Sequence, residues 1–114
     1  GVFGFLSVAL GAFAAHALKD RLDAYHLSVF KTGVEYQFFH TFAIALVGFL
    51  LFRGESSLLR SSGYAFTVGI LIFSGSLYLL AFSGQRWLGA ITPIGGLSFL
   101  IGWALLALAC YRMN

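Results

Sequence analysis

Four long stretches of the chain contain no charged residue, and short charged segments separate them. The stretches run from Val2 to Leu18, from about Tyr36 to Phe52, from Ser61 to Gln85 and from Trp87 to Tyr111. A helix needs about 20 residues, within a range of about 17–25, to cross the hydrocarbon core of a bilayer. No stretch has the ten-residue segments of alternating hydrophobicity that are typical of a membrane β-barrel. The pattern therefore predicts an all-α fold: an integral membrane four-helix bundle in which residues 1–114 form a single four-span transmembrane domain.

The connection between the first and second spans, from Lys19 to roughly Gly33, is the longest of the three. Asp23 is a residue type that caps helix starts, and apolar residues follow it without forming a clean stripe. We therefore expect an interfacial helix between the first and second spans, with the option that it continues into the second span through Gly33. The other two connections, "RGESSLLR" and "SGQRW", are expected to be turns, with Arg86 and Trp87 as anchors at the membrane interface.

The start of the fourth span has two interpretations. Thr92 followed by Pro93 resembles a helix N-cap and first helical position, where the missing N–H of proline costs nothing. In that case the helix begins at Pro93, and "LGAI" before it is an approach loop. The alternative is one longer helix that contains the proline. We favour the cap.

Composition agrees with a membrane location and narrows the function classes. The chain is 60% hydrophobic and 10% charged, whereas an ordinary soluble domain carries about 25% charged residues. The seven basic residues are spread singly rather than clustered, which argues against nucleic-acid binding. A single cysteine, Cys110, excludes an internal disulfide and a paired-cysteine metal site. The chain opens at Gly1 inside an apolar run, so we expect further residues before it.

Small residues recur at helical spacing within three of the spans. Small side chains let helix backbones approach closely in lipid, where there is no hydrophobic force between helices. The candidate packing positions are Ser7, Gly11, Ala15, Gly75, Gly95, Ser98 and Gly102. Whether they join the four helices to one another or to a second copy in a homo-oligomer stays open.

The stretch "VEYQFFHTF" places polar residues against a long apolar run. At 100° per residue, Tyr36, Gln37 and His40 share one face of the second span, and we expect His16 at the same membrane level if the first two helices are antiparallel. Ionisable residues inside a span are costly and point to function by default. The predicted polar pocket consists of His16, Tyr36, Gln37, His40, Ser74 and Tyr78.

Two interpretations of this pocket remain open. One interpretation is a site for a quinone head group, a lipid or a proton, with the histidines as the titratable groups. The other interpretation is a set of hydrogen bonds that joins helix ends. Two histidines without carboxylate or cysteine support make a weak metal site. No nucleophile triad, nucleotide-binding loop or carboxylate pair is present, so we expect neither an enzyme nor a bound cofactor.

Four blocks of the chain, in order, resemble a known family. They are "LGAFAAHALKD", "TGVEYQFFHTFAIAL", "IFSGSLYLLAFSG" and "RWLGAITPIGGLSFLIGWALL". These blocks are similar to the YgdD-like family of small four-span membrane proteins, a domain of unknown function, and the resemblance covers nearly the whole chain. It implies a multi-pass protein of the bacterial inner membrane and implies no activity. Since the loops are short, we expect partners within the bilayer, as for an accessory subunit of a larger inner-membrane complex.

Overall fold

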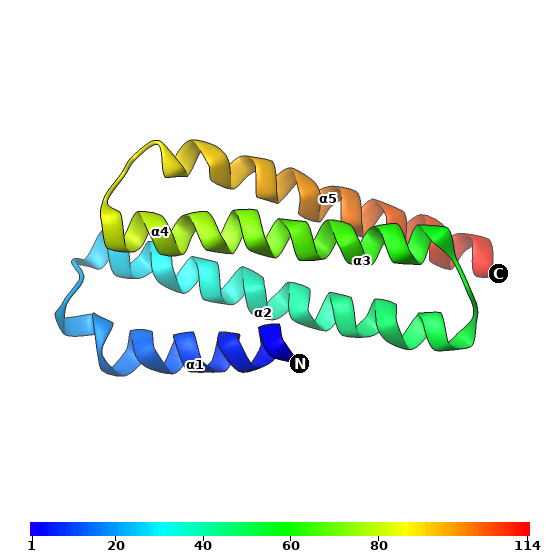
Figure 1. Cartoon of the computed structure of the whole chain (residues 1–114), viewed down its shortest axis with the longest axis horizontal. Coiled ribbons are helices and arrows are strands. Elements are labelled where there is room, and N and C mark those ends of the chain that lie inside the picture. The colour runs from blue at the N-terminus through cyan, green and yellow to red at the C-terminus, as the bar shows by residue number, and fades with distance from the viewer.

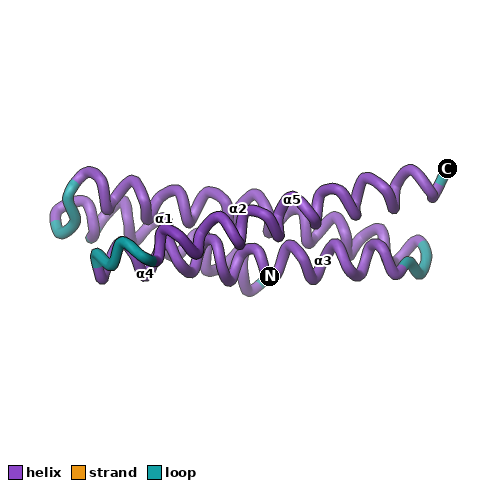
Figure 2. Tube along the Cα trace, turned by 90° about the horizontal axis from the view of Figure 1, so that it is seen from above, coloured by secondary structure: helices purple, strands orange, loops and turns teal.

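The computed structural model describes all residues, 1–114, and every element is a helix. The helices lie side by side along the long axis of an elongated molecule that measures 50 × 26 × 16 Å (Figures 1 and 2). The elements are α1 (Val2–His16), the 3₁₀ turn η1 (Leu18–Asp20), α2 (Ala24–Arg53), α3 (Ser57–Gly69), the π-helical turn η2 (Ile70–Ser74), α4 (Gly75–Ser83) and α5 (Leu88–Met113). Because η2 joins α3 to α4 without a break, the two form one rod from Ser57 to Ser83.

Three of these helices are long and apolar enough to cross a membrane. They are α2 with 30 residues, the α3–α4 rod with 27 and α5 with 26. The apolar helix α1 has 15 residues, which corresponds to about 22 Å, while the hydrocarbon core is about 30 Å thick. In both views the N-terminus lies near the middle of the long axis (Figures 1 and 2). The structure thus has three long candidate spans and one shorter apolar helix.

The segment expected to form an interfacial helix is the beginning of α2. The Asp23 side chain accepts a hydrogen bond from the backbone N–H of His26 at 2.8 Å, and the helix then continues through Gly33 to Arg53 without interruption. A capped start and the absence of proline leave nothing to end the helix before the apolar run. A separate interfacial helix is therefore not present, and the connection shortens to residues 17–23.

The prediction that the last helix begins at Pro93 was wrong. Helix α5 begins at Leu88, and Pro93 lies inside it. The backbone N–H groups of Leu88, Gly89 and Ala90 donate to carbonyls three residues earlier, at 3.0–3.2 Å, so the first turn closes before the proline. Proline then costs one hydrogen bond near the helix start, where the Thr92 hydroxyl donates to the Leu88 carbonyl instead of acting as a cap.

The apolar core has a large part where α2, α3 and α5 meet, a smaller part beside α1, and a third part between α4 and α5 that consists of Leu77, Leu80 and Leu88. The larger cluster consists of Ala43, Val47, Leu59, Phe66, Ile70, Phe99, Leu106 and Ala109. The smaller cluster, Ala14, Leu18, Phe30 and Ala81, joins α1, η1, α2 and α4. Since α1 lies against α2 along only part of its length, the end of the bundle near the α2–α3 turn is formed by α2, α3 and α5 without α1, and we call it the three-helix end (Figure 1).

The small residues have different roles in these contacts. A Cβ atom on Gly95 would lie 2.4 Å from the backbone nitrogen of Phe73, and one on Gly102 would lie 2.7 Å from the Phe66 ring. The Ser98 hydroxyl donates to the Ala65 carbonyl at 2.7 Å. These three residues let α5 approach the α3–α4 rod closely.

Helix α1 is held through its own small residues, with one correction to the predicted set. Ser7 is buried and bonds to the Phe3 carbonyl, and Gly11 faces Val34. Ala15 is exposed, and its neighbour Ala14 is the buried residue, because the contact face is rotated by one position. Gly75 was also expected at a helix contact, but no atom lies within 4 Å of the place where its Cβ would be.

Candidate functional site

Gln37 lies at the centre of the predicted pocket and joins three helices. It is 3% exposed on α2. Its side-chain amide donates from Nε2 to the Phe3 carbonyl of α1 at 2.9 Å, and its Oε1 accepts from the Tyr78 hydroxyl of α4 at 2.6 Å. Both ends of the amide are therefore used to fix α1 and α4 against α2.

A second contact between α2 and the α3–α4 rod lies one turn away. The Ser74 hydroxyl donates to the Gly33 carbonyl at 2.6 Å. A Cβ on Gly33 would lie 2.7 Å from the Tyr78 ring, so glycine is needed for this close approach. Ser76, two positions after Ser74, points to the other side of the rod and pairs with the Thr92 hydroxyl of α5 at 2.6 Å.

The His40 ring is held by hydrogen bonds at both nitrogens. Its Nδ1 lies 2.7 Å from the Tyr36 carbonyl, and the indole Nε1–H of Trp103 donates to Nε2 at 3.1 Å. Because an indole N–H can only donate, Nε2 must accept and Nδ1 must carry the proton. The ring also stacks on Phe99, with 3.5 Å between centroids and an angle of 9° between planes. His40 is therefore a neutral imidazole, and adding a proton at Nε2 would break the bond to Trp103.

His16 is not part of this arrangement, contrary to the prediction. Helices α1 and α2 are antiparallel, with Gly4 beside Thr41 and Gly11 beside Val34. Continued at this register, the exposed His16 is level with Val29. Since a helix rises about 1.5 Å per residue, the levels of His16 and His40 differ by about 16 Å along the axis. The two histidines cannot act as a pair.

Tyr36 takes part through its backbone and its ring. Its carbonyl receives the His40 bond, and its ring packs on Phe73 at 4.7 Å between centroids. We call the residues joined by these hydrogen bonds the polar seam: Phe3, Gly33, Tyr36, Gln37, His40, Ser74, Tyr78 and Trp103. No buried side-chain nitrogen or oxygen of the chain lacks a hydrogen-bond partner, and no cluster of three metal-ligating side chains is present.

Trp103, Phe99 and the Phe3 carbonyl belong to the site but were not predicted. Trp103 is 63 residues from His40 in sequence. The one signal in the sequence was an indole in the middle of an apolar span, since a buried Trp N–H usually needs an acceptor. Which acceptor it finds depends on the packing of α5 against α2.

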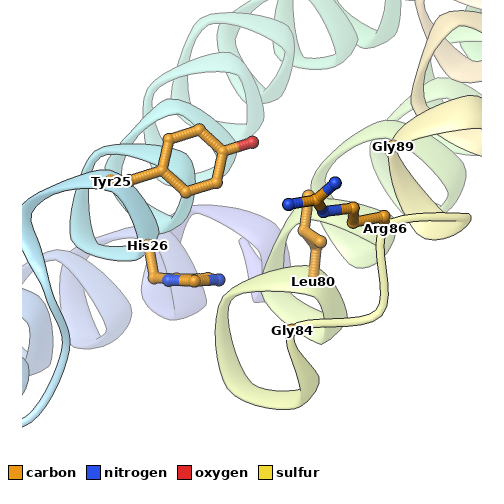
Figure 3. A pocket seen from close by; sticks show the side chains of 6 residues that line it. All are labelled: Tyr25, His26, Leu80, Gly84, Arg86 and Gly89. Carbon is orange, nitrogen blue, oxygen red and sulfur yellow. The ribbon is translucent and has the colours of Figure 1, made fainter.

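Three hollows lie outside the seam, and one of them, of about 370 Å³, is lined only by residues at the start of α2, between Ala24 and Glu35. The other two lie between different elements. A groove of about 260 Å³ runs between α2 and α3 in the three-helix end of the bundle and is lined by Ile44, Val47, Gly48, Leu51, Arg60, Gly63, Tyr64 and Thr67. A cleft of about 570 Å³ lies at the opposite end and is lined by Tyr25, His26, Leu80, Gly84, Arg86 and Gly89 (Figure 3). We refer to them as the α2–α3 groove and the interfacial cleft.

Long apolar helices joined by short turns around a hydrogen-bonded seam define a small, multi-pass helical membrane protein. Residues 10–96 match the family described as "Protein of unknown function (DUF423)", and the chain belongs to this family. A "UPF0382 membrane protein" of Haemophilus influenzae is 50% identical over 109 residues, which cover 96% of this chain and 87% of that protein.

Further relatives place the family in the bacterial cell membrane. The "UPF0382 inner membrane protein YgdD" of Escherichia coli K12 is 43% identical over 113 residues, covering 99% of this chain and 86% of that protein. A UPF0382 membrane protein of Staphylococcus aureus is 39% identical over 108 residues, covering 94% and 87%. No solved structure matches the chain. The protein is thus a multi-pass protein of the bacterial inner membrane, from a family without an established activity.

Proposed function

We propose that this protein is a non-enzymatic accessory subunit or interaction partner of a larger inner-membrane complex, and that it receives an apolar helix of its partner in the α2–α3 groove. The observation that carries the proposal is Gly48. This glycine lies in the middle of α2 and lines the groove, yet no atom lies within 4 Å of the place where its Cβ would be. Glycine inside a helix costs about 1 kcal/mol relative to alanine, and packing within the chain does not account for this one.

The surroundings of Gly48 fit an incoming helix. Gly63 of α3 also lines the groove, and the position of its Cβ lies 3.3 Å from Val47 of α2. Each of the two helices that form the groove therefore has a glycine in its wall. Small residues of this kind are typical of helix–helix contacts in lipid, because they let backbones approach. Ile44 and Leu51 add apolar surface, and the only charge in the lining, Arg60, is paired with Glu55. An apolar membrane helix is the occupant that these properties favour.

The polar seam gives less support to a bound quinone, lipid or proton. Its buried side-chain polar atoms already have partners within the chain, and His16 is distant from it. A ligand there would have to replace existing bonds. We therefore assign the seam to holding the helices together, and the partner helix to the groove.

We also propose that α1 is a fourth span, so that the chain forms a four-span bundle. Helix α1 carries no charged residue, and its outward-facing side chains, such as Phe5 and Val8, are apolar. Helix α1 lies beside the part of α2 that contains Val34 and Thr41, so it occupies the same hydrocarbon environment as that part of α2. A reporter fused before Gly1 tests this: four spans place it on the same side of the membrane as Asn114, and three spans place it on the opposite side.

Extraction in mild detergent followed by native mass spectrometry tests the proposed function. The variants are wild type, Gly48→Leu, and Gly75→Leu as the matched control, because Gly75 is also a helical glycine with open space at its Cβ position. We expect wild type and Gly75→Leu to retain a partner of defined mass, and Gly48→Leu to lose it while remaining folded. Equal retention of the partner by all three chains, or recovery of the wild-type chain without any partner, would contradict the proposal. A complex made only of copies of this chain would replace it with a homo-oligomer.

A further inference from the structure

We propose that the interfacial cleft binds the phosphate group of an anionic phospholipid. The cleft lies between the start of α2, which supplies Tyr25 and His26, and the α4–α5 turn, which supplies Arg86 (Figure 3). All three polar side chains extend toward the space between these two elements (Figure 3). This site is distinct from both the polar seam and the α2–α3 groove, and it does not depend on the proposed function.

Arg86 supplies the positive charge. The ion pairs of the chain are Asp23 with His26 and Glu55 with Arg60, so the Arg86 guanidinium has no carboxylate partner. A planar guanidinium can donate two parallel hydrogen bonds to phosphate oxygens, which makes arginine the usual side chain for this group. An unpaired guanidinium on the wall of a cleft is therefore suited to a phosphate.

His26 and Tyr25 add polar groups on the opposite wall. The Asp23 carboxylate lies 2.8 Å from His26 Nδ1, which leaves Nε2 free on the side of the ring that faces the cleft. Asp23 also accepts the backbone N–H of His26, so this acidic group is already engaged at the helix cap. The Tyr25 side chain is 65% exposed, and its hydroxyl makes no hydrogen bond within the chain. A phosphate held by Arg86 can accept from this hydroxyl.

The shape of the cleft favours a lipid over a free phosphate ion. Leu80, which is buried, forms an apolar part of the wall, and two glycines leave the opening wide. Gly84 has a φ of +69°, a left-handed conformation that ends α4 and that a residue with a side chain rarely adopts. The cleft lies where α2 begins and α4 ends, next to the exposed Trp87, which is the level of the lipid head groups. Basic pockets between helices at this level are typical lipid head-group sites.

Native mass spectrometry with added lipid tests the inference on the intact chain. Phosphatidylglycerol is the anionic probe and phosphatidylcholine the zwitterionic one. The variants are Arg86→Gln and, as the matched control, Arg112→Gln, which removes the same charge at the C-terminal end of α5, away from the cleft. We expect one phosphatidylglycerol to be retained by wild type and Arg112→Gln, and about tenfold weaker retention by Arg86→Gln, as for loss of one charge-assisted contact.

A conservative variant and a competitor complete the test. Tyr25→Phe should weaken retention of phosphatidylglycerol by a smaller factor, because it removes one neutral donor and leaves Arg86 in place. Equal retention of the two lipids by wild type, or equal losses in the two arginine variants, would overturn the proposal. Displacement of the lipid by an equal concentration of inorganic phosphate would show a free-phosphate site and would overturn the lipid assignment. Loss of the partner protein in Gly48→Leu, with lipid binding unchanged, separates this site from the α2–α3 groove.

Discussion

Replacing Gly95 by alanine tests how closely α5 must approach the α3–α4 rod. The new Cβ would lie 2.4 Å from the backbone nitrogen of Phe73 and 2.8 Å from its Cα. Ordinary contacts at such positions begin at 3.4 Å, so the helices must separate by about 1 Å. The obstacle is backbone, which cannot rotate away as a side-chain tip would. Gly96→Ala is the matched control, because its Cβ would meet only the Phe73 ring at 3.8 Å.

The magnitude follows from the contacts on either side of Gly95. A separation of about 1 Å stretches the Ser76–Thr92 hydrogen bond from 2.6 Å to about 3.6 Å, beyond the range of a hydrogen bond. The Ser98 bond to the Ala65 carbonyl, at 2.7 Å, is stretched in the same way. Such bonds contribute on average about 0.6 kcal/mol each in a membrane protein, and overpacking costs about 1–3 kcal/mol. The loss of these two bonds is one part of the overpacking cost and is not added to it. Since both variants gain the same helix propensity, Gly95→Ala should be less stable than Gly96→Ala by about 1–3 kcal/mol.

The assay is equilibrium unfolding in mixed detergent micelles, followed by circular dichroism for wild type and both variants. We expect Gly96→Ala to unfold at or above the wild-type midpoint and Gly95→Ala to unfold clearly below it. Equal midpoints for the two alanine variants would refute the reasoning, because they would mean that α5 does not pack on the Phe73 backbone.

Three further predictions concern individual polar contacts. Trp103→Phe removes the donor to His40 Nε2 and should lower the free energy of unfolding by about 0.6–1.7 kcal/mol, whereas the same change at the exposed Trp87 should leave it unchanged. If Trp87→Phe were the less stable of the two variants in the same unfolding assay, the assigned tautomer would be contradicted. Tyr78→Phe removes the donor to Gln37 and should lower the free energy of unfolding by a similar amount, about 0.6–1.7 kcal/mol. Tyr64→Phe, at an exposed tyrosine, is the control, and equal stabilities of the two variants would exclude a role for the Tyr78 hydroxyl. Hydrogen bonds from the His26 backbone and, to a smaller extent, from the His26 side chain lower the pKa of Asp23 below 3.8, so the stability that Asp23 contributes is present above pH 3.8 and is lost as the pH falls toward the lower folded-state pKa. Asp23→Asn should remove this part of the acid dependence when the unfolding midpoint is measured against pH. An unchanged pH profile in this variant would contradict the assignment.

The sequence by itself determined the membrane class and most of the helices. Uncharged runs as long as Trp87–Tyr111 are stable only in lipid or a large core, and in lipid a helix satisfies its own backbone hydrogen bonds. These are local properties, which do not depend on what packs beside the helix. The same local reasoning identified Asp23 as a helix cap and placed Gln37 and His40 on one helix face.

Helix periodicity predicts on which face of a helix a residue lies, but it does not predict which residue of another helix it contacts. Only the packing of α5 against α2 decided that His40 bonds to Trp103, and only the antiparallel register of α1 separated His16 from His40. Pro93 could begin a helix or lie within one, and the turn closed by the carbonyls of residues 85–87 decided between them. The identity of a hydrogen-bond partner depends on side chains far apart in sequence meeting at distances below about 3.5 Å, and that is a property of the packed bundle alone.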